Sequence, residues 1–186
     1  MFSIDPIAGL LGKLIDEVSA EKRRNHEERM KIIAMISDSK LRDAYVHQLL
    51  LNQFFLDSSE NAQYTLQNAA KHSQWLAEAI NYYHQDHGAT KEQGEQISRE
   101  LRLLAVKISK IASLDELKVV YEAATLFTDK LSRFRHREHK YSLEHEIRHG
   151  ILNPLNDCIA IENNLQRRVA LTLLGENINL KFLEEA

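Results

Sequence analysis

Residues that interrupt helices are almost absent from this chain. Its 186 residues include only two prolines and six glycines. Apolar residues recur every three or four positions along most of the sequence, whereas β-branched residues rarely alternate with polar ones. This pattern is typical of amphipathic helices and differs from that of strands. We therefore expect an all-α fold, a bundle of about six helices.

The length and composition indicate one globular domain. Hydrophobic residues make up 44% of the chain and charged residues 27%, which is too apolar for disorder and sufficient for a sizeable core. We expect a single α-helical domain over residues 1–186. It should begin with a long amphipathic helix within residues 1–36 and end with a short tail over 176–186.

Polar residues mark several expected helix ends. Asp5 and Pro6 suit the N-cap and the first helical position, so the first helix should start there. Gly88 should serve as a left-handed C-cap before the fourth helix. Two pairs fit the capping box that opens a helix: Thr90 with Gln93, and Ser113 with Glu116.

The last third of the chain should contain two helices. The fifth helix, which begins at Ser113, should be long and continue past Phe134 through a more polar stretch. Gly150 and Pro154 should then kink or end it, because proline lacks an amide hydrogen. A sixth helix should follow up to Gly175, with a short strand or docking turn over 178–182.

The apolar faces of these helices define the expected core. A second helix over about residues 41–55 and a third over 66–83 should contribute to it. Trp75, the only tryptophan, should anchor the core or an interface. Five further positions should be buried: Leu104, Ile108, Val120, Phe127 and Leu165.

Charge and cysteine content narrow the protein class. A net charge of −3 argues against dedicated nucleic-acid binding, which usually requires an excess of Lys and Arg. The single cysteine, Cys158, suits a reducing compartment. Because no run reaches the roughly 18 apolar residues of a membrane span and no signal peptide is recognisable, we expect a cytoplasmic protein. The stripe of residues 6–18 also fits membrane contact, but packing in the core or an oligomer is favoured.

Residues 131–156 form the most distinctive segment, with four of the nine histidines among many charged side chains. Charges three or four residues apart keep such a helix soluble or provide a surface for a partner. We therefore expect a non-enzymatic interaction module whose partner is another protein. A homo-oligomer is a second arrangement that the sequence allows. We assign partner contact to Arg133, Arg137, His145, Arg148 and His149.

One alternative for this segment is a metal site. Residues 145–149 spell HExxH, which resembles the zinc motif of zincin metalloproteases. That resemblance implies zinc on His145 and His149, with water activated by Glu146. Glu146 and His149 also resemble one ExxH half-site of the di-iron bundles. Because a convincing third zinc ligand and a second ExxH half-site are both lacking, we expect neither a metal nor another cofactor.

Another alternative is phosphotransfer. The eight residues 149–156, HGILNPLN, resemble the H-box of histidine-kinase dimerisation helices. This resemblance implies that His149 accepts a phosphoryl group, although Gly150 stands where the box usually has an acidic residue. A phosphotransfer or kinase-docking protein is therefore the main rival of the binding module.

A further alternative is RNA cleavage. Arg133 and His139 match the RxxxxxH spacing of the HEPN ribonucleases, which are also helical. That resemblance implies acid–base chemistry by His139 and phosphate stabilisation by Arg133. The sequence favours the non-enzymatic hypothesis over both enzymatic ones.

Overall fold

The protein is described by a computed structural model that covers residues 7–35, 60–134 and 142–160. These residues form helices and turns, with no strand among them. The elements are α1 (Leu10–Met35), α3 (Glu60–Tyr82), the 3-10 turn η1 (His84–His87), α4 (Lys91–Ser109), α5 (Leu114–Lys130), α6 (Leu143–Ile147) and the π-helical η2 (Arg148–Leu152). The all-α fold class is thus confirmed for this part of the chain. The helix expected near 41–55, the segment 178–182 and Leu165 fall outside the described residues.

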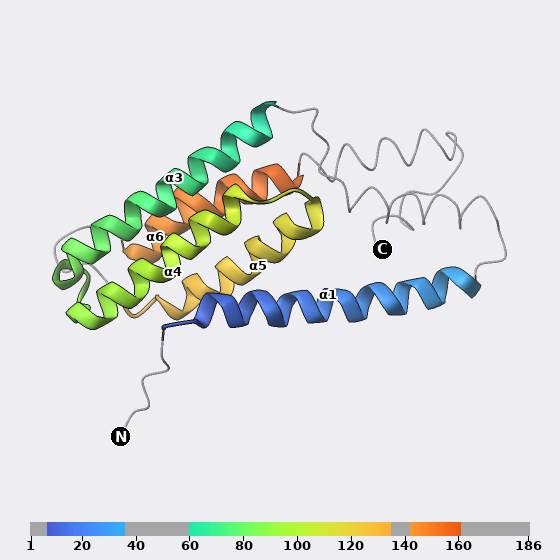
Figure 1. The fold of residues 1–186 in the computed structure, drawn as a ribbon, viewed down its shortest axis with the longest axis horizontal. Coiled ribbons are helices and arrows are strands. Elements are labelled where there is room, and N and C mark those ends of the chain that lie inside the picture. The colour runs from blue at the N-terminus through green and yellow to red at the C-terminus, as the bar shows by residue number, and fades with distance from the viewer. Residues whose placement is uncertain (1–6, 36–59, 135–141, 161–186) are drawn as a thin grey trace, which may run out of the picture.

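Four helical segments form the body of the bundle. α3 and α4 make an antiparallel hairpin, and α5 and the α6–η2 helix pack against it (Figure 1). α1 runs along α5 and also touches α4. Only the first half of α1 is buried, through Leu11, Leu14 and Val18, whereas residues 20–31 are mostly exposed. The second half of α1 therefore extends beyond α5 along one side of the molecule (Figure 1).

The core contains the residues that the apolar periodicity selects. Leu104, Ile108 and Phe127 expose at most 1% of their surface, and Val120 exposes 6%. These four predictions are confirmed. Trp75 is different, because 57% of its surface is exposed. It is therefore not a core residue, and the alternative role as an interface anchor stays a prediction.

α1 begins at Leu10 and not at Pro6, so the predicted start is wrong. Gly9 has a φ of 74°, in the left-handed region, which is incompatible with a continuous helix through this position. The carboxylate of Glu100, on α4, is 5% exposed and accepts hydrogen bonds from the amides of Gly9 at 2.8 Å and Leu11 at 3.0 Å. A buried side chain from another helix thus satisfies the free amides at the start of α1.

The capping predictions are confirmed in one case and half correct in the other. Thr90 and Gln93 form a full capping box, with amide-to-side-chain distances of 3.2 and 3.0 Å. The Ser113 hydroxyl accepts from the Glu116 amide at 3.1 Å. The Glu116 carboxylate, however, accepts from the amide of Ala112 at 2.7 Å. The carboxylate thus bonds to the amide one residue before Ser113, so only one of the two hydrogen bonds of the second capping box forms.

The predicted long fifth helix is wrong, because α5 ends at Lys130 after 17 residues. The following amides bond to carbonyls three residues earlier, which tightens the chain into a turn. This turn brings Phe134 into the core, where it is 3% exposed. A new helix starts at Leu143, and the Ser142 hydroxyl accepts from the His145 amide at 3.2 Å. The burial of Phe134 and the N-cap at Ser142 thus stabilise two separate helices more than the apolar spacing stabilises one long helix.

The helix does not end at Gly150 or Pro154, because the chain is helical from 143 to 160, but its regular α-helical winding is interrupted there. Residues 148–152 widen into a π-helical turn, in which the Asn153 amide bonds to the Arg148 carbonyl. A wider turn accommodates Pro154, whose ring would otherwise meet the carbonyl four residues earlier. Residues 153–160, where the sixth helix was expected to begin, therefore continue the helix that starts at Leu143.

Two glycines permit close helix contacts. A Cβ added to Gly94 would lie 2.5 Å from the Cβ of His84 and 3.1 Å from the Ile80 carbonyl oxygen. A Cβ added to Gly150 would overlap the imidazole of His72. α3 therefore approaches both α4 and η2 at positions where a side chain would collide with it.

Candidate functional site

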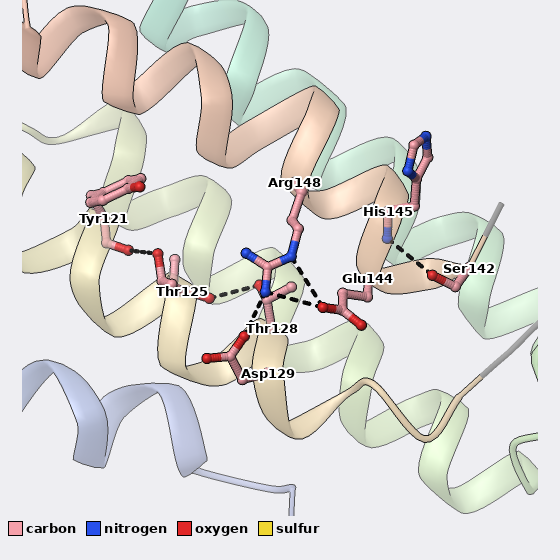
Figure 2. Close-up of polar contacts among 9 residues, drawn as sticks. Tyr121, Thr125, Thr128, Asp129, Ser142, Glu144, His145 and Arg148 are labelled. Atoms are coloured by element: carbon pink, nitrogen blue, oxygen red, sulfur yellow. Dashed lines mark hydrogen bonds and ion pairs between the residues drawn. The ribbon is translucent and has the colours of Figure 1, made fainter.

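Arg148, a predicted partner-binding residue, is engaged within the protein. Its Nε donates to Glu144 Oε1 at 3.1 Å, and its Nη2 donates to Asp129 Oδ1 at 2.6 Å (Figure 2). The hydrogen bond to Glu144 raises the pKa of the guanidinium, and the bond to Asp129 adds to this effect. Because two carboxylates neutralise it, Arg148 joins α6 to α5 and contributes little net positive charge to a partner surface.

The other predicted binding residues do not gather around Arg148. The Arg133 guanidinium lies over the ring of its neighbour Phe134, 4.9 Å from the centroid. The His145 ring points away from Arg148 (Figure 2). It lies instead against His149, with 4.1 Å between the ring centroids, and His149 is exposed. Two further predicted positions, Arg137 and His139, fall outside the described residues.

The histidine pair has only part of the geometry of a zinc site. His145 and His149 face the same side of one helix, as HExxH requires. Zinc in a catalytic site is held by three protein ligands. Within residues 7–35, 60–134 and 142–160, no group of three or more His, Cys, Asp or Glu side chains is placed to hold a metal ion.

A second candidate site lies between the middle of α1, the end of α4 and the start of α5. Here the three elements enclose an open groove of about 640 Å³, which we call the cationic groove. Its basic side chains are Lys22, Arg23, His26, Arg29, Lys107, Lys110 and Lys118. Its apolar side chains are Ile15, Ile111, Val119 and Val120. Only two lining residues are acidic, Asp115 and Glu116.

The charge of the cationic groove is opposite to that of the whole chain. Six Lys or Arg side chains line it with two carboxylates, although the chain as a whole has a net charge of −3. Among the described residues, Lys22 alone of these six has an ion-pair partner, Glu122 Oε2 at 3.4 Å. The remaining cations thus create a local positive potential that favours anionic ligands.

Two charged groups at the floor are partly withdrawn from water. Burial lowers the pKa of the Lys118 ammonium, although the nearby Asp115 acts in the opposite direction. Asp115 keeps contact with solvent, yet desolvation by its neighbours raises the pKa of its carboxyl. Charges in such surroundings are screened less than charges in open water, so Lys118 attracts a bound anion more strongly and Asp115 repels it more strongly.

The groove could not be predicted from the sequence, because its cations come from three separate segments. Residues 21–31 mix basic and acidic side chains, a pattern typical of an ordinary solvated helix face. Packing of α1 on α5 brings the basic residues of that stretch next to Lys107 and Lys110. The density of cations in residues 21–31 could have indicated a basic surface. It could not have indicated which residues lie opposite them.

None of the described helices combines the length and apolar character needed to cross a bilayer. Comparisons of the chain with protein-family models, with curated proteins and with solved structures find no match.

Proposed function

We propose that this protein is a non-enzymatic helical binding module that holds an acidic, amphipathic segment of another protein in the cationic groove. One observation carries the proposal: six Lys or Arg side chains line a concave surface together with four apolar side chains, on a protein that is acidic overall. The proposal keeps the protein–protein interaction expected from the sequence but moves the contact away from residues 131–149, where Arg148 is already paired.

The mixed lining of the groove favours a peptide over a nucleic acid. An amphipathic helix lays apolar side chains into such a groove at spacings of three or four residues. Ile111 and Val119 offer a floor for those side chains, and the basic rim offers partners for carboxylates. A phosphate backbone would gain nothing from these apolar side chains.

A designed peptide tests this proposal. The probe is a fluorescein-labelled peptide in which Glu and Leu repeat with helical spacing, titrated with the full chain while anisotropy is followed. Binding should weaken as salt rises, because rim charges are screened. The double variant Lys107→Glu, Lys110→Glu reverses two exposed rim charges and should weaken binding by about tenfold or more.

The matched control reverses two exposed lysines outside the groove, Lys91→Glu and Lys130→Glu. It changes the net charge equally and should alter the affinity by no more than about twofold. The proposal fails if the wild type does not bind the peptide or if the control loses as much affinity as the rim variant. Preferential binding of an RNA oligonucleotide of equal charge would replace the peptide hypothesis with a nucleic-acid one.

Phosphotransfer stays a second candidate because the exposed ring of His149 meets the access requirement of a phosphoacceptor. The ring beside it is His145 and not a carboxylate, and Gly150 occupies the acidic position of the H-box. We therefore expect no acid-labile, base-stable label after incubation with phosphoramidate. A label that His149→Gln removes would favour phosphotransfer over the binding module.

A further inference from the structure

α3 exposes a line of aromatic side chains. Tyr64 is 67% exposed, Trp75 57% and Tyr82 76%. The three positions span 18 residues, which is about five helical turns, so they lie along one line of the helix surface. Tyr and Trp are enriched where proteins bind each other, because their rings contribute large contact areas.

This line lies opposite the face of α3 that the bundle uses. The buried side chains of α3 include Leu66, Ala69 and Ile80, on the side that packs against α4 and η2. α3 lies at the edge of the bundle, with its outer side away from the other described helices (Figure 1). The exposed aromatic residues are therefore not needed for the core, and we call their surface the α3 face (Tyr64, Asn68, Lys71, Trp75, Glu78, Tyr82).

The α3 face carries one cation and one anion, on either side of Trp75. Lys71 precedes Trp75 by one turn, and Glu78 follows it by nearly one turn. An antiparallel pair of α3 helices centred near residue 73 sets Tyr64 of one copy opposite Tyr82 of the other. In the same arrangement Lys71 of one copy meets Trp75 of the other and lies within about a turn of its Glu78. Both contacts occur twice, as in any isologous interface.

We propose that the α3 face binds a second copy of this chain and makes the protein a two-fold symmetric dimer. The three aromatic side chains expose roughly 300–500 Å² per copy, taking about 150–250 Å² for a fully buried ring residue. Two copies with the flanking polar residues therefore reach the ~1,000 Å² that a specific interface needs. Across the interface, the Lys71 ammonium would lie over the Trp75 ring of the other copy and pair with its Glu78. These contacts favour the antiparallel orientation of the two helices.

This inference goes beyond the binding function proposed above and does not depend on it. The cationic groove is lined by residues of α1, α4 and α5 and by the loop between the last two, with none from α3. A dimer through the α3 face therefore leaves both grooves accessible. Such a dimer would present two equivalent sites to a bivalent acidic partner and bind it more tightly than a single site.

Two single charge-reversal variants, Lys71→Glu and Glu78→Lys, test the dimer. Sedimentation velocity of the full chain should show a monomer–dimer equilibrium. Lys71→Glu alone places two acidic residues against each other across the interface, and Glu78→Lys alone places two basic residues there. Each variant should raise the dimer dissociation constant by about tenfold or more.

An equimolar mixture of the two variants should dimerise again, because both contacts of the mixed dimer join opposite charges. At one contact the glutamate introduced at 71 meets the lysine introduced at 78, and at the other the native Glu78 of the first chain meets the native Lys71 of the second. This recovery cannot come from a folding defect. Arg102→Glu, an exposed reversal on α4, is the control and should dimerise like the wild type. The proposal is overturned if the wild type is monomeric, if either single variant dimerises like the wild type, or if the mixture stays monomeric.

Discussion

Glu100 should be one of the most sensitive positions in the protein, because its buried carboxylate joins α4 to the start of α1. The informative change is Glu100→Gln, which keeps the shape of the side chain and removes its charge. Both carboxylate oxygens accept backbone amides, from Gly9 at 2.8 Å and from Leu11 at 3.0 Å. Glutamine offers one oxygen and turns an NH₂ donor toward the other amide, so that one of the two bonds is lost.

The magnitude follows from these contacts. A hydrogen bond to a charged group contributes roughly 1.5–3 kcal/mol, and the negative charge near the α1 N-terminus contributes about 0.3–1 kcal/mol more. We expect Glu100→Gln to reduce the free energy of unfolding by about 2–3 kcal/mol. With a urea dependence of about 1–3 kcal/mol per molar, the unfolding midpoint should fall by about 1 M or more.

Urea unfolding followed by circular dichroism measures this loss, and amide hydrogen exchange locates it. The Leu11 amide should exchange faster in Glu100→Gln, because its acceptor is gone. Glu95→Gln on the same helix is the matched control. If both variants have the same midpoint and Leu11 exchange is unchanged, the carboxylate does not hold α1 in place. Loosening of α1 should also weaken peptide binding, since α1 forms one wall of the cationic groove.

The other predictions concern the close contacts, the core and metal. Gly94→Ala should lower the free energy of unfolding by roughly 1–3 kcal/mol, although alanine favours helices, because its methyl meets His84 Cβ. Gly150→Ala should also destabilise, and adding His72→Ala should restore part of the loss; additive effects in a double-mutant cycle would refute this contact. Leu104→Ala should cost about 2–5 kcal/mol, and an unmoved urea midpoint would remove this residue from the core. A chelator should leave the melting temperature unchanged, whereas stoichiometric zinc in protein purified without a His tag would restore the HExxH hypothesis.

Features that depend on near neighbours in the chain could be predicted from the sequence. Apolar spacing identified the helical class and the burial of Leu104 and Phe127, because one face of a helix repeats every three or four residues. The capping box of Thr90 with Gln93 was equally predictable, since both of its hydrogen bonds span three residues.

Contacts between residues far apart in the chain set where several helices begin and end. α1 starts at Leu10 because a carboxylate about 90 residues away in sequence accepts its amides. α5 ends early because Phe134 gains burial by leaving the helix, and the later helix passes Pro154 through a π-turn. In each case a distant contact outweighs the local preference for a different boundary.

The cationic groove was hidden from sequence reasoning for the same reason. Its basic side chains come from α1, from the end of α4 and from α5, and each segment alone supplies too few cations to identify a site. Electrostatic potential depends on distances in space, and packing of α1 against α5 sets those distances. The sequence therefore determined which charges exist, and the fold decided which of them act together.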